Sequence, residues 1–320
     1  MAGISAVAMV LGASSAAAAA KSAPGANLVI KIKAIKQLPG DPPYITLDES
    51  ARAPGFVVTF SVQNKGGRAS GKAVIALALE QKGRSKWFKD DFIELRAHSK
   101  PKTVSWKVDN LRADLGFLTP TATVKWATTN KHQRSDSDSA DPIPVIARDW
   151  NVSSFQTRIN VGGTGPSGQT QADGKLMYRF SSFDEADKEF VYKPYGQLTN
   201  QARYNGGGCS GSASESKDMG LSPWPGDTSE LMIKGSLTQY NAGVEARDQP
   251  AVNVNVTCPT LGNFSFPVQV PWENLETFNG SPNFPRMSPD QTTLTGQGSK
   301  MTPVGELKFL WTFNARLSGA

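Results

Sequence analysis

The sequence predicts an all-β protein made of two antiparallel β-sandwich domains, and three observations support this. Large apolar residues alternate with small or polar ones in many short runs, whereas no run has the 3.6-residue period of an amphipathic helix. The chain contains 30 glycines and 21 prolines, which are typical of turns between strands. Its 320 residues exceed one typical domain of roughly 100–200 residues.

Composition and charge favour two folded bodies. Hydrophobic residues make up 38% of the chain and charged residues 19%, which excludes a wholly disordered protein. The net charge of +6 is unevenly distributed, because residues 26–148 carry +8 and residues 149–320 carry −3. We therefore expect an Ig-like domain over residues 26–147 and a larger second β-sandwich over residues 148–320.

The first residues indicate export. Residues 3–20 read GISAVAMVLGASSAAAAA, and the first charge after them is Lys21. This segment resembles the apolar core and small-residue cleavage region of a secretory signal peptide, although no Lys or Arg precedes it. An Ala-rich helix or a membrane anchor is the alternative. We expect residues 1–25 to be removed and the mature protein to be secreted or periplasmic, with no integral membrane segment, because no later stretch reaches ~20 apolar residues.

Strands in the first half follow from a period of two. Side chains on a strand point to opposite faces in turn, so each alternating run buries one face. The stretch FVVTFSVQNKGG shows such a run and then stops at Asn64. Asn and Gly accept a left-handed backbone, and no helix start follows, so residues 64–67 predict a turn rather than a phosphate-binding loop. The runs of this half cover residues 28–32, 56–63, 75–79, 104–108 and 124–126.

These runs together resemble a known family. The order NLVIKI, GFVVTFSVQNKGG, AVIALALE, LRAHS, TVSWKV and TATVKWATTN, followed by SDSDSADPIP, is similar to the bacterial adhesion-related Ig-like module often called CARDB. The chain departs from the family pattern in a long insertion at residues 44–55 and in having a single asparagine, Asn130, in the closing segment. The resemblance covers residues 27–147 and implies a non-catalytic module of an exported or surface protein.

The second half is predicted to be β-rich but less regular. A polar segment at residues 131–144 is expected to be a linker or last loop before it. Long segments rich in Gly, Ser and Pro separate the expected strands, and loops of this length often carry function. The expected strands cover residues 155–161, 176–183, 189–192, 231–240, 252–258, 264–270 and 307–317.

Cys209 and Cys258 are the only cysteines. An even number in an exported chain favours a disulfide, which would stabilise a loop of this length by about 4 kcal/mol in the chain-entropy model. Two buried free thiols are the alternative. The run Gly207–Gly211 around Cys209 also suggests a nucleophile, but no histidine lies nearby in sequence to act as its base, so the disulfide is preferred.

No other catalytic or metal-binding motif stands out. The two histidines, His98 and His132, lie in polar segments of the first half, and we expect no cofactor. Acidic residues gather at two places and are the weak candidates for a Ca²⁺ site, although a solvated acidic loop is the preferred interpretation. These candidates are Asp136, Asp138, Asp141, Asp184 and Asp187.

Basic and aromatic side chains provide candidate binding residues. In the first half, basic residues flank an aromatic pair, a pattern that grips anionic polymers but also protects strand edges from pairing. In the second half, aromatic residues in Pro- and Gly-rich stretches either bind sugars or proteins or plug the ends of the sandwich. The candidates are Lys82, Arg84, Lys86, Trp87, Tyr195, Trp224 and Trp272.

Two functions remain open from the sequence. The preferred one is an exported, non-catalytic binding or structural protein that contacts a cell-surface protein or polysaccharide through loops of the second domain. Nucleic acid is not expected as a partner of an exported protein. The alternative is a secreted glycan hydrolase, which needs only carboxylates, here drawn from Asp184, Glu185, Asp187 and Glu189.

Overall fold

The computed structural model describes residues 25–37, 44–53, 55–109, 111–128, 132–160, 168–218, 230–238, 240–242, 252–268, 286–302 and 305–317. Every regular element in these ranges is a β-strand, so the predicted all-β class is confirmed. Within the same ranges, no helix is long and apolar enough to cross a membrane. The expected signal peptide up to residue 24, and Trp224 and Trp272, lie outside the described residues.

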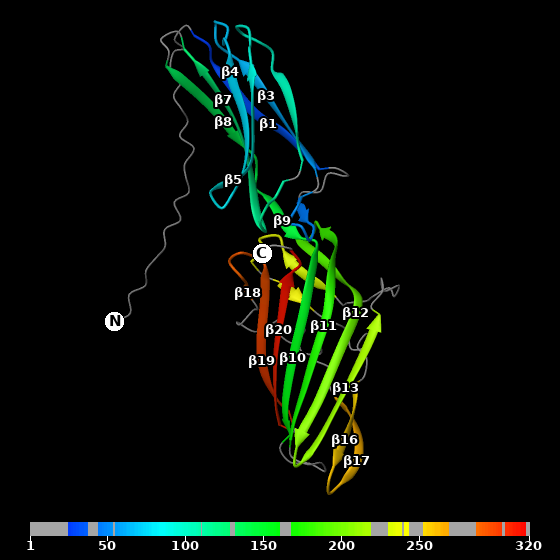
Figure 1. Cartoon of the computed structure of the whole chain (residues 1–320). Helices are drawn as coiled ribbons and strands as arrows, with labels where there is room; N and C mark the ends of the chain where they lie inside the picture. The colour runs from blue at the N-terminus through cyan, green and yellow to red at the C-terminus, as the bar shows by residue number, and fades with distance from the viewer. Residues whose placement is uncertain are drawn as a thin grey trace, which may run out of the picture.

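The first half contains two facing sheets (Figure 1). One has three antiparallel strands in the order β1 (Leu28–Gln37), β3 (Phe56–Asn64), β6 (Lys102–Val108). The other has the order β2-β9-β7-β4-β5, with β8 paired to β7, and its only parallel pair among the described strands is β2 with β9. Its strands are β2 (Ile45–Leu47), β4 (Ala73–Gln81), β5 (Arg84–Ile93), β7 (Gly116–Ala127), β8 (Gln133–Ser139) and β9 (Ile143–Ala147).

The predicted alternation explains the core between these sheets. On β3, Phe56, Val58, Phe60 and Val62 are fully buried, while the alternate residues Val57 and Thr59 are only half-buried. The facing strand β4 buries its alternate residues in the same way. Each such large side chain contributes roughly 1.5–3 kcal/mol when it leaves water, so the period of two holds the two sheets together.

The polar segment expected to be a linker is instead strand β8 over residues 133–139. Its carboxylates lie against the edge of β1: Asp136 Oδ2 accepts a hydrogen bond from the Ile30 amide at 2.9 Å, and Asp138 Oδ2 accepts one from the Ile32 amide at 2.7 Å. Side chains of one sheet therefore satisfy backbone donors on the edge strand of the other. The polar composition suggested a loop, because polar side chains usually face water. Here two of them bind backbone amides of β1 instead.

The second half forms one eleven-stranded antiparallel sheet with the main order β17-β16-β13-β12-β11-β10-β20-β19-β18. Strands β11 and β12 have 17 and 18 residues, far above the usual 5–6. The strands are β10 (Asp149–Asn160), β11 (Gly168–Asp184), β12 (Glu189–Gly206), β13 (Cys209–Asp218), β14 (Leu231–Lys234), β15 (Tyr240–Ala242), β16 (Val252–Cys258), β17 (Gly262–Val268), β18 (Arg286–Met287), β19 (Thr293–Thr302) and β20 (Gly305–Ala315).

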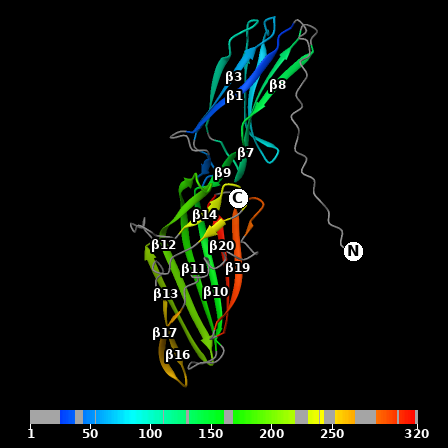
Figure 2. The same ribbon diagram turned by 180° about the vertical axis from the view of Figure 1, so that it is seen from behind.

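Two segments cover the inner face of this sheet and give the half its second layer (Figure 2). Strand β15 reaches β20, where the Trp311 indole donates a hydrogen bond to the Tyr240 hydroxyl at 3.0 Å. Strand β17 reaches β12, where the rings of Phe266 and Tyr204 meet edge to face at 5.5 Å. The opposite, outer face has no such cover among the described residues.

The two halves meet at a packed junction. Strand β9 ends at Ala147 and β10 begins at Asp149, so the chain passes directly from one sheet to the other. The buried carboxylate of Asp149 pairs with Arg148 at 3.1 Å and Arg179 at 2.9 Å. The Tyr192 hydroxyl donates to the Ala147 carbonyl at 2.9 Å, and burial raises the pKa of Tyr192 well above its usual value. The ring therefore stays a neutral donor at this joint.

Candidate functional site

The outer face of the long sheet presents rows of uncharged polar side chains. Antiparallel pairing sets Gln169 beside Asn205, which in turn lies beside Ser210. Two residues along each strand, where side chains return to the same face, Gln171, Arg203 and Ser212 repeat the row. The residues between these positions on β11 and β12, such as Thr170 and Tyr204, are buried on the inner face.

The same rows continue across β10, β20 and β19. Thr157 lies beside Gln171 on one side and Lys308 on the other, and Ser153 lies beside Lys175 and Thr312. We call this surface the polar face. It comprises Thr293, Thr295, Gln297, Ser299, Lys308, Leu310, Thr312, Asn314, Asn151, Ser153, Phe155, Thr157, Gln169, Gln171, Asp173, Lys175, Thr199, Gln201, Arg203, Asn205, Ser210, Ser212, Ser214 and Ser216, all exposed or half-buried.

Few of these side chains are charged. Among the 24 residues of the polar face, Asp173, Lys175, Arg203 and Lys308 carry a charge. The rows end at further charged residues on the same strands, namely Glu306 on β20, Asp218 on β13 and Arg179 on β11. Arg203 and Asp173 approach each other to 3.9 Å, which further reduces the net field of the surface. Most positions of the polar face carry a hydroxyl or an amide, groups that form hydrogen bonds without a net charge.

A hollow of about 430 Å³ lies on this face at the β11–β12–β13 end. The hairpin between β12 and β13 turns at Gly207 and Gly208, whose φ angles of 59° and 77° suit glycine. Beyond it, serines leave space beside the longer amide side chains. The lining consists of Gln169, Gln171, Arg203, Tyr204, Asn205, Ser210, Gly211 and Ser212.

The chemistry of this hollow is hydrogen bonding rather than proton transfer. An amide both donates and accepts, a hydroxyl does the same, and a guanidinium only donates. Among the described residues, no three His, Cys, Asp or Glu side chains lie together in a way that would hold a metal ion. The arrangement suits a ligand with many hydroxyl groups.

Most of the acidic candidates form hydrogen bonds or ion pairs within the protein. Asp184 is in the exposed turn between β11 and β12, where its Oδ1 accepts hydrogen bonds from the amides of Ala186 at 2.8 Å and Asp187 at 3.2 Å. Glu185 pairs with Lys188 in the same turn, and Glu189 pairs with Lys234. Asp141 and Asp187 have exposed side chains. Asp136, Asp138 and Asp184 thus hold backbone amides, and Glu185 and Glu189 form ion pairs, so these five carboxylates have structural roles.

The basic candidates of the first half do not form one free surface. Lys82 occupies the turn between β4 and β5 with a φ of 51°, and Arg84 begins β5 with an exposed side chain. Lys86 pairs with Asp114 at 2.7 Å, and Trp87 is half-buried against the core. The next side chain, Phe88, is 59% exposed and is therefore the more open aromatic ring at this place.

Tyr195, expected in a loop, lies within strand β12. Its ring is half-buried, and the Arg179 guanidinium lies over it at 4.1 Å from the ring centre. The same Arg179 holds Asp149 at the junction, so Tyr195 supports that ion pair from the side. A stacked, half-buried ring of this kind is a packing element rather than an open platform for a ligand.

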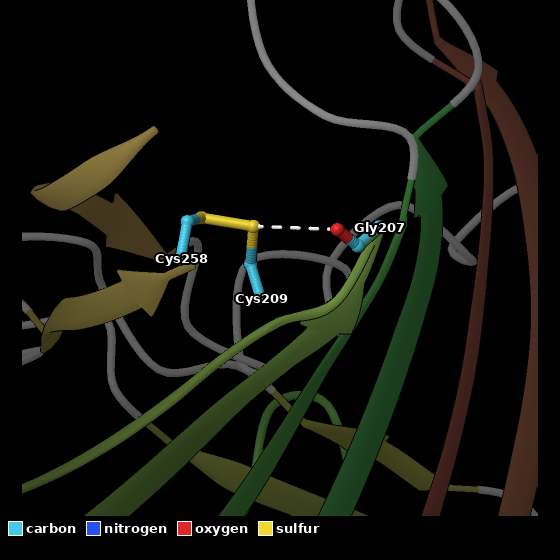
Figure 3. The surroundings of a disulfide bond; sticks show 3 residues. All are labelled: Gly207, Cys209 and Cys258. Atoms are coloured by element: carbon cyan, nitrogen blue, oxygen red, sulfur yellow. Dashed lines mark hydrogen bonds between the residues drawn. A yellow bond between two sulfur atoms is a disulfide. The ribbon is translucent and has the colours of Figure 1, made fainter. Parts of the chain in front are cut away.

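The predicted disulfide between Cys209 and Cys258 is confirmed (Figure 3). It joins β13 to β16 directly beyond the pairs Ser210–Thr257 and Gly211–Val256, in the same register. The Cys209 sulfur also lies 3.8 Å from the Gly207 carbonyl oxygen. With both sulfurs bonded, the nucleophile interpretation of the glycine-rich run is excluded in this state.

Sequence reasoning missed the polar face, although one signal for it was present. In β13 serines recur at every second position, at 210, 212, 214 and 216. This is the period of a strand, with polar instead of apolar residues repeating. No protein-family model matches this chain, and no curated protein matches it with significant similarity.

Proposed function

We propose that this chain is an exported, non-catalytic binding protein of the cell surface or periplasm, and that its polar face holds a neutral polysaccharide. The observation that carries the proposal is the low charge at the centre of this broad surface, which no described segment covers. The proposal moves the contact from the loops of the second half to its sheet. Residues 161–167, 219–229, 243–251 and 269–285, which include most of those loops, lie outside the described residues.

Desolvation explains why an uncharged face suits a sugar polymer. A charged side chain loses far more hydration energy than an amide or a hydroxyl when a ligand covers it. Neutral groups that exchange water for sugar hydroxyls lose little and regain about 0.5–1.5 kcal/mol per hydrogen bond. On a face of amides and hydroxyls, each hydrogen bond to the ligand thus contributes little, and affinity comes from the sum of many hydrogen bonds.

The sheet also fixes the spacing of these groups. Strands lie about 4.8 Å apart, and residues on the same face of one strand lie about 6.8 Å apart, so the face is a regular grid. Side chains held on strands are more precisely placed than those on loops. An extended polymer lies along such a grid with little rearrangement of the protein.

An apolar pair interrupts the grid near its centre. Phe155 on β10 and Leu310 on β20 are partners in register, and Leu310 is 45% exposed. Asp173 on β11 lies on the other side of Phe155. Aromatic side chains contribute large contact areas at low entropic cost, and the carbon–hydrogen faces of sugar rings pack well against them. This pair therefore supports a sugar ligand over a purely polar one.

Three observations favour export. The disulfide requires an oxidising compartment to persist in most organisms. Residues 3–20 resemble a signal peptide. Residues 27–147 resemble CARDB-like modules, which belong to exported or surface proteins. The hydrolase alternative has less support, because Asp184, Glu185 and Glu189 already serve a turn and two ion pairs.

The test is a binding array of neutral and charged polysaccharides with the full mature chain. The double variant Gln171→Ala/Asn205→Ala removes two amides from the hollow, and the control Asn253→Ala/Asn255→Ala removes two amides from the exposed face of β16. We expect a neutral polysaccharide to bind, with affinity reduced at least about tenfold in the first variant, since each hydrogen bond contributes about 1 kcal/mol. Equal losses in both variants, or no bound polysaccharide, would contradict the proposal.

A further inference from the structure

We infer that the end of the first half farthest from the second half binds a polyanion, namely a polysaccharide bearing carboxylate or phosphate groups. We call this end the basic tip and define it by the described residues 64–72, 94–102, 125–128 and 132–135, at the top of Figure 1. It has one acidic residue, Glu94, and two histidines. Its cations are Lys65, Arg68, Lys72, Arg96, Lys100, Lys102, Lys125 and Arg134.

A buried asparagine fixes the loops of the tip side by side. The Asn64 side chain is fully buried, and its Oδ1 accepts hydrogen bonds from the amides of Asn27 at 3.0 Å and Gly66 at 2.9 Å. Its Nδ2 donates to the carbonyls of Arg68 at 2.7 Å and Arg96 at 3.1 Å. The backbone positions of two cationic residues on different loops are thus held by one side chain, which lowers the entropic cost of binding.

A second set of hydrogen bonds closes the same loops. The His98 amide donates to the Gly66 carbonyl at 3.0 Å, and the Ser99 amide donates to the Asn64 carbonyl at 3.0 Å. Gly66 leaves no room for a side chain there, because an added Cβ would lie 2.2 Å from the Gly25 carbonyl oxygen. The loops that carry the cations of the basic tip therefore have a fixed backbone arrangement.

The charges of the tip are not neutralised by neighbours. Within the described residues, none of its eight lysines and arginines forms an ion pair, and all eight side chains are exposed. Lys86, at the other end of the same sheet, is by contrast paired with Asp114. Like charges crowded without partners repel one another, so a polyanion that neutralises them is bound favourably.

The positive charge continues along the outer face of the three-stranded sheet. In register across that face, Lys31 pairs with Ser61 on β3, and Lys36 pairs with Val57 on β3. On the other side of Val57 lies Lys107, which forms an ion pair with Asp109 at 3.0 Å. Strand β3, with nine residues, spans about 30 Å. Cations spread over this length fit an extended polymer better than a single small anion.

An anionic membrane would meet the same charges, but the apolar side chains argue for a polymer. Membrane contact draws exposed aromatic or aliphatic residues into the lipid boundary. Near the tip, the one large hydrophobic side chain exposed among the described residues is Phe92, and the Lys72 ammonium lies 3.9 Å above its ring centre. The aromatic surface is thus partly occupied by a cation of the tip itself.

The test compares two triple variants of the full mature chain that remove the same charge. Arg68→Gln/Arg96→Gln/Lys100→Gln changes the tip, and Lys82→Gln/Arg84→Gln/Lys89→Gln changes the opposite end and edge of the same half. Circular dichroism and a denaturation curve confirm that both fold. The probes are polygalacturonate for carboxylates, long-chain polyphosphate for phosphates, and vesicles containing phosphatidylglycerol.

We expect the unchanged protein to bind at least one of the two polymers, with an affinity that falls as salt rises. The tip variant should bind at least about tenfold more weakly, since each cation near an anionic surface contributes about 1 kcal/mol, and the control should stay within about twofold. Binding to neither polymer, binding to vesicles alone, or equal losses in both variants would overturn the inference. None of these outcomes depends on the polar face, so the two proposals are tested separately.

Discussion

Asn64 closes strand β3 with a side chain that satisfies four backbone groups from three segments of the chain. In an isolated strand those backbone groups would form hydrogen bonds with water. Here the neighbouring loops exclude water from them. Each buried donor or acceptor left without a partner costs about 1–3 kcal/mol. A single amide thus determines how the loops at this end of the first half are arranged.

We predict that Asn64→Ala lowers the free energy of unfolding by about 2–5 kcal/mol, because several buried groups lose their partner at once. Urea denaturation of the full mature chain measures this. The adjacent Gln63→Ala is a suitable control, since the Gln63 side chain donates one hydrogen bond, to the Ser99 carbonyl at 3.1 Å. A loss no larger in Asn64→Ala than in Gln63→Ala would contradict the role given to Asn64.

The two carboxylates of β8 lead to a prediction that separates a structural role from a metal site. Asp136→Ala/Asp138→Ala should destabilise the protein by about 2–4 kcal/mol, because two edge amides of β1 lose charge-assisted hydrogen bonds. Asp136→Asn/Asp138→Asn keeps an accepting oxygen at each position and should lose less. Thermal unfolding with and without Ca²⁺ provides the check: Ca²⁺ should leave the midpoint unchanged, whereas a rise abolished by either variant would favour the metal interpretation.

At the scale of elements, the strands that sequence predicted well are those with large apolar residues at every second position. Strand β16 has the predicted bounds, 252–258, because three valines alternate with polar residues, so that one face is buried and the other is exposed. The end of β3 at Asn64 also agrees, but none of residues 64–67 has a positive φ. The Asn64 side chain holds the turn instead, because its Oδ1 accepts a hydrogen bond from the Gly66 amide. In these elements local preference and packing point the same way.

Strands β8 and β13 were missed for two different physical reasons. Strand β8 consists almost wholly of polar residues, and its carboxylates bind an edge strand that lies 106 positions earlier in sequence. Strand β13 looks like a loop because its inner positions, which include Gly211 and Ala213, carry no large apolar side chain. At Gly211 an added Cβ would lie 2.2 Å from the Asn255 carbonyl oxygen, so close approach of β16 demands glycine. Neither contact is visible in local sequence.

The disulfide is the covalent link between β13 and the β16–β17 hairpin. These strands share two residue pairs next to the bond, so their pairing alone is short. We predict that Cys209→Ala/Cys258→Ala lowers the free energy of unfolding by about 4 kcal/mol, the chain-entropy value for a closed loop of this length. Denaturant unfolding measures the loss, and reduction of the unchanged protein should reproduce it. Equal stability with and without the bond would contradict this role.

For the whole molecule, the charge division along the sequence corresponds to a division of surfaces. The first half, with its net charge of +8, carries the basic tip, and the second half, with −3, carries the nearly uncharged polar face. The packed junction at Asp149 and Tyr192 links them through ion pairs and a buried hydrogen bond. On the two proposals above, the protein contacts a charged polymer with one half and a neutral polymer with the other.

Sequence predicted the class of the fold and the disulfide, but little of the candidate site. Candidates were chosen by residue type, which favoured Trp87, Tyr195 and the carboxylates of residues 184–189. The structure places these in packing, in an ion-pair support and in a turn. The polar face depends on the register of six strands, and register across distant strands is set by the whole sheet rather than by any one segment.

The most direct test of the proposed function is a side-chain footprint of the full mature protein with and without the neutral polysaccharide selected by the array. Hydroxyl-radical labelling read by mass spectrometry reports Phe155 and Leu310, the two reactive apolar side chains at the centre of the polar face. We expect the ligand to protect both residues and to leave the exposed Phe88 of the first half unchanged. Protection of Phe88 with unaltered labelling of Phe155 and Leu310 would contradict the assignment of the polar face as the binding surface.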